Sequence, residues 1–185
     1  MPSSPTLRRA VVADAPGLAR VHVRAWQAAY RGVMSDDYLD GLDVGQRTAW
    51  WRDRLSAPGA GPTVAVVDGA VVGFAHAGSA REAATGDDGE LYAINLDPSV
   101  WRQGIGTALL RAAEADLRTG GHRVAALWVA TANPRARAFY ERHGWRADGV
   151  SRTVAVGGLG GGDTVEVAET RYGTDLLGGS VGPSR

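Results

Sequence analysis

The sequence contains no cysteine and no lysine, and each absence excludes a group of functions. Without cysteine there is no disulfide framework, no thiolate nucleophile and no cysteine-ligated zinc site. All twenty basic residues are arginine, which excludes Schiff-base enzymes and Walker-type phosphate loops because both need a lysine. The four histidines, His22, His76, His122 and His143, show no ligand spacing, so we expect no metal site.

Charge and hydropathy exclude two further classes of partner. Twenty acidic residues balance the twenty arginines, and no basic run is dense enough to follow a nucleic-acid backbone. No apolar run approaches the roughly 20 residues that span a bilayer, and residues 1–6 lack the apolar core of a signal peptide. We therefore expect a cytoplasmic protein that binds neither nucleic acid nor a membrane, and the sequence leaves a homodimer open.

The apolar patterns predict one α/β domain over residues 1–177, followed by a disordered tail over residues 178–185. Asp14 with Pro16 is a helix start, and Asp68-Gly69 is the two-residue signal of a tight hairpin. Strands are expected at Leu7–Val12, Thr63–Val67, Ala70–Ala77, Glu90–Leu96, Arg123–Val129, Val150–Val156 and Thr164–Tyr172, and helices at Ala15–Tyr30, Ser35–Leu42, Val44–Leu55, Gly104–Leu117 and Asn133–His143. This order implies a mixed sheet with helices on both faces.

A loop with two glycines joins strand Glu90–Leu96 to the next helix. Glycines let the backbone approach an anion closely, and a helix N-terminus offers unpaired N–H groups. An ordinary strand-to-helix turn has the same signature, but the chemistry indicates a phosphate or pyrophosphate. The residues concerned are Arg102, Gln103, Gly104, Ile105, Gly106 and Thr107.

The same loop fits a dinucleotide-binding fingerprint poorly. That fingerprint needs a small residue three positions after the second glycine, where this chain has Leu109. It also needs an acidic residue about 20 positions further on, to hold a ribose, but Val124–Val129 is apolar. The pattern therefore argues against a nicotinamide cofactor.

A second informative segment runs from Asn133 to Trp145. Asn133 and Tyr140 are seven residues apart and share one helical face, so an amide and a phenol can line one groove. Taken alone, Asn133 is equally a helix cap and Tyr140 a packing residue.

Together the two segments resemble the acetyl-CoA-binding motif and the N-x-x-A-x-x-F-Y-x-x-x-G-F/W motif of the GNAT N-acetyltransferase superfamily. The resemblance is strongest from Glu90 to Trp145 and is compatible with most of the chain. It implies a GNAT-like α/β fold with a mixed, mostly antiparallel, twisted sheet of seven strands. It also implies acetyl-CoA as acetyl donor and, as acceptor, a primary amine of a small molecule or a peptide N-terminus. The alternative is a non-catalytic sensor that only binds an acyl-CoA.

The resemblance also implies a coenzyme A site. The matching residues are Ile94, Leu96, Arg102, Gln103, Gly104, Ile105, Gly106, Thr107, Asn133 and Tyr140. Ile94 and Leu96 would run beside the pantetheine arm, and the loop would hold the pyrophosphate. One position departs from the family pattern, because Trp101 stands where Gln or Arg is common.

Acetyl transfer to an amine calls for a base and an acid. The acceptor is mostly an ammonium at neutral pH, with a pKa near ~10.4, and only its neutral form attacks a thioester. By resemblance Glu90 is the candidate base and Tyr140 the acid that protonates the departing thiolate, although Glu90 could also be a plain strand-end carboxylate. By analogy with the fold, the acceptor pocket could be lined by Trp26, Tyr30, His76, Tyr92 and Trp128, each of which could equally belong to the core.

We predict that the protein binds acetyl-CoA far more tightly than NAD or ATP. The loop lacks both the third small residue of the NAD fingerprint and the lysine of a Walker motif. Isothermal titration calorimetry with the three ligands measures this, and equal or tighter binding of NAD would contradict the coenzyme A assignment.

Overall fold

The structure is a computed structural model that describes residues 4–59, 61–82, 88–156 and 164–177. Its strands are β1 (Thr6–Arg9), β2 (Thr63–Val67), β3 (Ala70–Ser79), β4 (Asp88–Leu96), β5 (Val124–Ala130), β6 (Arg146–Val156) and β7 (Val165–Asp175), and its α-helices are α1 (Ala15–Tyr30), α2 (Asp36–Asp40), α3 (Val44–Ser56), α4 (Ile105–Thr119) and α5 (Pro134–Arg142). The strands form one sheet in the order β1-β2-β3-β4-β5-β7-β6. The β4–β5 pair is parallel and the five other pairs are antiparallel, which confirms the predicted mixed, mostly antiparallel sheet.

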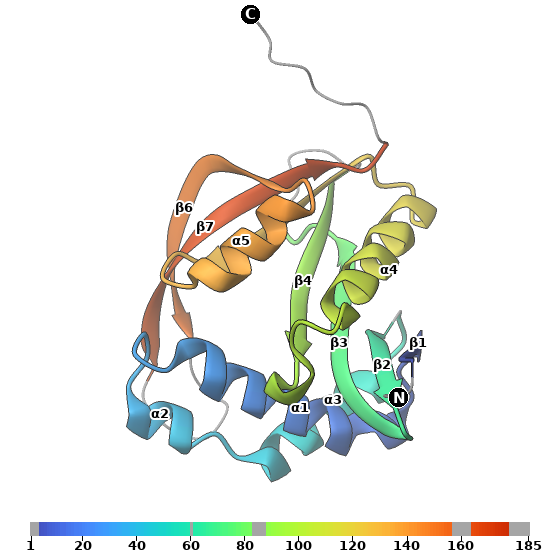
Figure 1. The fold of residues 1–185 in the computed structure, drawn as a ribbon, viewed down its shortest axis with the longest axis vertical. Coiled ribbons are helices and arrows are strands. Elements are labelled where there is room, and N and C mark those ends of the chain that lie inside the picture. The colour runs from blue at the N-terminus through green and yellow to red at the C-terminus, as the bar shows by residue number, and fades with distance from the viewer. Residues whose placement is uncertain (1–3, 60, 83–87, 157–163, 178–185) are drawn as a thin grey trace, which may run out of the picture.

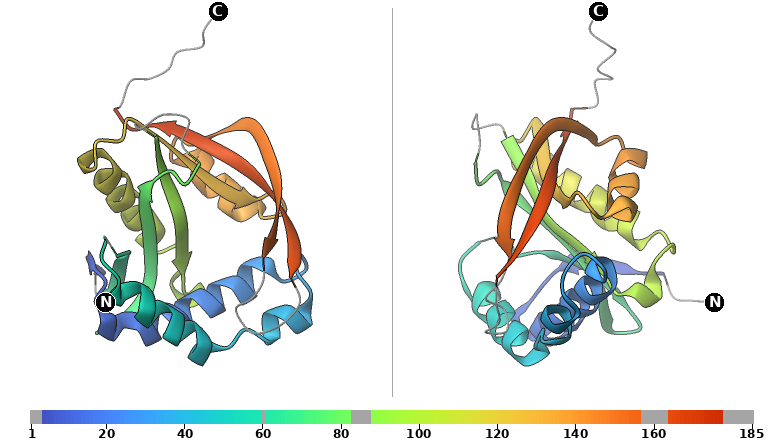
Figure 2. Two further views of the ribbon diagram at one scale, coloured as in Figure 1. Left: turned by 180° about the vertical axis from the view of Figure 1, so that it is seen from behind. Right: turned by 90° about the vertical axis from the view of Figure 1, so that its left-hand side faces the viewer.

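Helices cover both faces of the sheet, as Figures 1 and 2 show. Successive side chains of a strand point to opposite faces of the sheet, so the contacts of neighbouring residues show which helices cover each face. Val64 and Phe74 pack with α1 and with Trp51 of α3. Their neighbours Ala65 and Ala75 instead join the cluster that contains the apolar side of α4. Helices α1 and α3 therefore lie on one face, and α4 with α5 on the other.

Helix α4 binds the sheet through one apolar stripe. Its buried side chains recur at helical spacing and are Ile105, Leu109, Leu110, Ala113 and Leu117. The helix ends before Gly120 and Gly121, the second of which has a positive φ of 89°. This stripe fixes where the helix, and hence its N-terminus, lies on the sheet.

Strands β4 and β5 pair only over a short stretch and then diverge. Their parallel pairing joins Asp88–Leu91 to Val124–Leu127, after which β4 pairs with β3 alone. The register of β3 and β4 shifts so that Tyr92 is an extra residue on β4, a β-bulge that bends the strand. Figure 1 shows β4 turning away from β5 and β7 toward α1. One edge of β4 is thus left without a strand partner from Tyr92 to Leu96.

Several strand ends differ from those predicted by up to four residues, and two of these differences have a local cause. The first strand ends at Arg9, because the Asp14 carboxylate accepts a hydrogen bond from the Val11 N–H at 2.8 Å and turns the chain. Strand β6 begins at Arg146, since a register shift after Ala147 carries it past a segment that looks like a turn in the sequence. Helix Ala15–Tyr30 is confirmed.

The predicted hairpin is confirmed as well, with positive φ angles of 48° at Asp68 and 78° at Gly69. The segment between the last two predicted strands, residues 157–163, and the predicted tail over residues 178–185 lie outside the described residues. None of the described helices is long and apolar enough to cross a bilayer.

We predict that Leu109→Ala lowers the free energy of unfolding by about 2–5 kcal/mol, because the side chain is fully buried between α4 and the sheet. Leu177→Ala removes the same atoms from a side chain that is 59% exposed and should change it by less than about 0.5 kcal/mol. Urea denaturation of both variants measures the difference, and equal losses would contradict the placement of α4.

Candidate active site

The N-terminus of α4, like that of α1, has no side-chain cap. Helices α2, α3 and α5 each begin with a side chain that accepts a backbone N–H. Helix α4 begins after Gly104, which has a φ of 82° and supplies no side-chain cap. Its first helical bond is the Ala108 N–H donating to the Gly104 carbonyl at 3.1 Å, so the N–H groups of residues 105–107 are not used by the helix. Together with the helix dipole they form an anion-binding position.

The loop before α4 has the backbone shape that such a position requires. Arg102 has a φ of 63°, an uncommon angle for a residue with a side chain. Gln103 is exposed and donates from its amide to the Ser99 carbonyl at 3.2 Å. Ile105 is buried in the core, so it can offer an outside ligand only its backbone. Gly106 keeps the backbone bare, and a Cβ there would come within 3.5 Å of the Phe139 ring.

Trp101 holds a cation beside this loop, which the sequence analysis missed. The guanidinium carbon of Arg135, in the first turn of α5, lies 3.4 Å from the centre of the Trp101 ring. The Trp101 indole N–H donates to the Leu96 carbonyl at 3.2 Å and so fixes the ring against β4. Burial, and then the charge of Arg102, lower the pKa of Arg135. Two guanidinium groups thus act on one another next to the open helix end, and a bound anion would relieve their repulsion.

A chain of hydrogen bonds connects the first turn of α4 to the end of α5. The His143 Nδ1 lies 2.7 Å from the Phe139 carbonyl, which can only accept, so Nδ1 carries the proton. In neutral His143 the Nε2 then accepts from the Thr107 hydroxyl at 3.0 Å. The Thr107 side chain is therefore engaged with α5, which leaves its backbone N–H for a ligand.

The other predicted coenzyme A residues lie along the same side of the sheet. Ile94 and Leu96 lie on the part of β4 that has left β5, and their side chains pack on the core under α4. Asn133 caps α5, with its Oδ1 accepting the Ala136 N–H at 3.0 Å. The structure thus shows the cap, one of the two interpretations of Asn133 left open by the sequence.

Tyr140 lies in α5 with its ring buried among other aromatic rings. The ring centre of Phe139 is 5.4 Å away, that of Trp145 6.3 Å and that of Tyr172 6.4 Å. Burial, and then the neighbouring phenol of Tyr30, raise the pKa of Tyr140 above its ordinary value. The phenol is therefore neutral at physiological pH and keeps a proton to donate.

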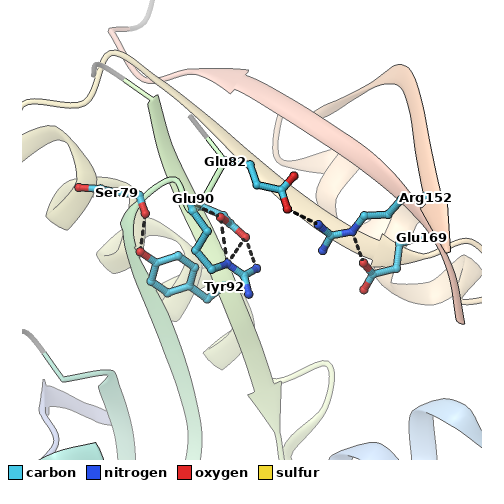
Figure 3. Close-up of polar contacts among 7 residues, drawn as sticks. Ser79, Glu82, Glu90, Tyr92, Arg152 and Glu169 are labelled. Carbon is cyan, nitrogen blue, oxygen red and sulfur yellow. Dashed lines mark hydrogen bonds and ion pairs between the residues drawn. The ribbon is translucent and has the colours of Figure 1, made fainter. Parts of the chain in front are cut away.

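Glu90 lies on β4 next to Ala126 of β5, where it is buried and held by an arginine (Figure 3). Its carboxylate accepts from the Arg81 guanidinium, with the Nε 3.1 Å away, and from the Arg81 backbone N–H at 3.0 Å. Burial raises the pKa of Glu90, but the hydrogen bonds and charge of Arg81 and the charge of Arg152 outweigh it, so the pKa is lowered. Glu90 is thus a stable carboxylate with reduced basicity.

A sequence model described as the acetyltransferase (GNAT) family matches residues 22–145. The chain belongs to this family. It is 37% identical over 130 residues to the uncharacterized N-acetyltransferase YuaI of Bacillus subtilis, which covers 70% of this chain and 73% of that protein. It is 32% identical over 140 residues to an uncharacterized N-acetyltransferase of Archaeoglobus fulgidus, covering 72% of this chain and 88% of that protein.

Solved structures show the same GNAT fold. PaiA N-acetyltransferase from Thermoplasma acidophilum, in complex with coenzyme A, matches with a TM-score of 0.67 and 18% identity, over 94% of this chain and 99% of that chain. YncA from Salmonella typhimurium, with its cofactor acetyl-CoA, matches with a TM-score of 0.65 and 20% identity, over 98% of this chain and 99% of that chain. The family and its relatives identify the chain as an acetyltransferase.

The five aromatic residues predicted to line a GNAT acceptor pocket lie in three places. Trp26 and Tyr30 of α1 have ring centres 5.1 Å apart, as do His76 of β3 and Tyr92 of β4. Trp128 lies on β5 with the Arg152 guanidinium 3.9 Å above its ring. Within the described residues, no group of three or more His, Cys, Asp or Glu side chains is placed to hold a metal.

Ionised side chains lie near three of these rings, those of Tyr30, Tyr92 and Trp128, and no pattern in the sequence indicated them. Figure 3 shows Arg152 between Glu169, 2.9 Å away, and Glu82, 3.8 Å away. Tyr92 donates from its hydroxyl to the Ser79 carbonyl at 2.5 Å. Burial, and then the charge of Glu169, raise the pKa of Tyr30 to about 12. Tyr30 is therefore influenced by the charge of Glu169 and in turn raises the pKa of Tyr140.

We predict that Arg135→Met weakens acetyl-CoA binding by about tenfold or more, because it removes a charged donor next to the open end of α4. Arg142→Met removes an exposed arginine from the other end of the same helix and should leave affinity unchanged. Calorimetry on both variants measures this. Equal affinities for wild type and Arg135→Met would remove Arg135 from the phosphate site.

Proposed function

We propose that residues 1–177 form one domain that transfers the acetyl group of acetyl-CoA to a primary amine of a small molecule or a peptide N-terminus. One juxtaposition carries the proposal. The unpaired edge of β4 is joined by residues 97–104 to the uncapped N-terminus of α4, with Arg102 and Arg135 beside it. An extended amide-containing arm that ends in phosphates fits such an edge and such a helix end.

In this proposal the residues named for coenzyme A act mainly through their backbones. The arm runs along Ile94 and Leu96, and the N–H groups of residues 102–107 hold the pyrophosphate. The Arg135 guanidinium on Trp101 supplies the side-chain N–H donors that Gln or Arg supplies elsewhere in the family. When bound, the thioester supplies the electrophilic carbonyl, and an N–H on the free edge of β4 is available to its oxygen.

Tyr140 acts as the acid. Its raised pKa keeps the phenol protonated, so it can give a proton to the departing thiolate sulfur. The ring packing fixes where that proton is offered.

Glu90 acts as the base through water. The carboxylate is ionised and lies on the sheet face opposite α4 and α5, because its neighbour Leu91 belongs to the core on the α4 side. The ion pair with Arg81 lowers the basicity of Glu90, and a water molecule would relay the proton from the acceptor's ammonium to the carboxylate. Five aromatic side chains surround the amine, namely those of Trp26, Tyr30, His76, Tyr92 and Trp128. The negative charges of Glu82 and Glu169 favour an acceptor that arrives as an ammonium.

The proposed function is tested by incubating the protein with acetyl-CoA and a panel of amines and measuring free thiol, with mass spectrometry of the products.

Tyr140→Phe should lower kcat by about 10²–10⁴, because it keeps the ring and deletes only the proton donor. Its affinity for acetyl-CoA should be unchanged. Full kcat in a variant whose chemical step limits turnover would contradict the acid role, and binding without acetylation of any amine would favour the sensor.

Glu90→Gln should reduce kcat most near neutral pH and progressively less toward the pKa of the acceptor amine, since the amine then loses its proton without help. Glu166→Gln makes the same change in an exposed side chain of β7 and should behave as wild type. A pH–rate profile of both variants measures this. A Glu90→Gln deficit that is constant with pH would show that Glu90 positions the acceptor and does not deprotonate it.

A further inference from the structure

A buried arginine lies between the helices on the face away from the coenzyme A groove. Among the described residues, three ionised side chains are buried. Asp14 pairs with Arg8, and Glu90 pairs with Arg81. Arg47 of α3 is only 3% exposed, and no hydrogen bond or ion pair joins it to another described residue, although none of its nitrogens is among the fully buried side-chain atoms that lack a partner. Its guanidinium carbon lies 5.4 Å from the centre of the Trp50 ring, which provides a weak electrostatic contact and no hydrogen-bond acceptor.

The polar groups around Arg47 also lack partners. Five buried side-chain atoms in the described residues have no hydrogen-bond partner, and four of them are Nδ1 and Nε2 of His22, Oη of Tyr38 and Nε1 of Trp51. Arg47 and Trp51 lie four residues apart on α3 and so share one face of that helix, and the charge of Arg47 acts on the His22 imidazole and the Tyr38 phenol. The His22 and Trp51 ring centres are 6.2 Å apart. The unsatisfied atoms therefore gather where α1, α2 and α3 meet.

These groups are almost all donors. The guanidinium, the phenol and the indole each offer N–H or O–H groups. Burial, and then the charge of Arg47, lower the pKa of His22 to about 3, so the ring is neutral and offers one donor. Burial lowers the pKa of Arg47 to about 10, and the Tyr38 phenol opposes this shift. No carboxylate of the described residues is among the groups that act on it. Buried donors that lack partners beside a cation are a position that an anion can stabilise.

We propose that Arg47, Tyr38, His22 and Trp51 bind a small carboxylate or inorganic oxyanion between α1, α2 and α3. The planar guanidinium matches two oxygens of such an anion, and the phenol and indole donate to the remaining lone pairs. The site is separate from the groove of the proposed acetyl transfer, which lies along β4 and the N-terminus of α4. A bound anion would join α1 to α2 and α3 and so stiffen the helix that carries Trp26 and Tyr30.

The test measures thermal unfolding without acetyl-CoA while sodium formate or inorganic phosphate is titrated at constant ionic strength. Sodium gluconate, too bulky for a buried site, keeps the ionic strength constant. A ligand that binds only the folded state raises Tm saturably, and at about ten times Kd we expect a rise of about 3–6 °C. Arg47→Met should abolish the rise. Arg52→Met, in an exposed position of the same helix, should keep it.

The absence of a saturable rise in wild type, or the same rise in Arg47→Met, overturns the proposal. Without added anion, Arg47→Met should melt no lower than wild type, because it removes an unpaired buried charge and keeps a long side chain. Should that variant not fold, Tyr38→Phe decides, since it deletes one hydroxyl and should weaken anion binding by about twofold to tenfold. An unchanged Kd in Tyr38→Phe then overturns the site. All arms omit acetyl-CoA, so failure here leaves the acetyl transfer untouched.

Discussion

The end of parallel pairing between β4 and β5 at Leu91 and Leu127 is the constraint on which the rest of the site depends. Backbone N–H and C=O groups inside a sheet normally all find partners, and an unpaired edge is a place where another extended chain can bind. Here the edge lies in the middle of the sheet, because β5 stays with β7 while the bulge at Tyr92 bends β4 away. Residues 97–104, which include a short 3-10 helix at Pro98–Val100, then connect β4 to α4, whose N-terminus is also unpaired. Two separate sets of free backbone groups are thereby aligned for one ligand.

The absence of lysine shapes the electrostatics of this site. Every cation is a guanidinium, which is planar and can stack on an aromatic ring while it pairs with an anion. Three aromatic rings near the site each have a guanidinium over their face. Arg135 lies over Trp101 at 3.4 Å, Arg152 over Trp128 at 3.9 Å and Arg81 over Tyr92 at 5.3 Å. Arg81 and Arg152 are paired with glutamates, whereas Arg135 faces another arginine. The charge available to a phosphate is therefore concentrated at the end of α4.

Local signals predicted most of the fold. Asp14 and Pro16 start α1 where the sequence indicates, and Asp68-Gly69 makes the hairpin, because caps and turns depend on residues close in the chain. The start of β6 was missed because Gly149, with a φ of 86°, follows polar residues that resemble a turn. Side-chain partners could not be predicted in the same way. Arg135 reaches Trp101 only when α5 packs beside α4, and a spacing of 34 residues carries no signal for that contact.

Hydrogen–deuterium exchange, with and without acetyl-CoA, tests most directly whether the open edge and the helix end form one binding site. The account predicts that the ligand slows exchange at the amides of Tyr92–Leu96 and of residues 102–107. It also predicts little change in Asp88–Leu91, which already pairs with β5. Protection confined to other elements, or no protection at a saturating concentration, would contradict it.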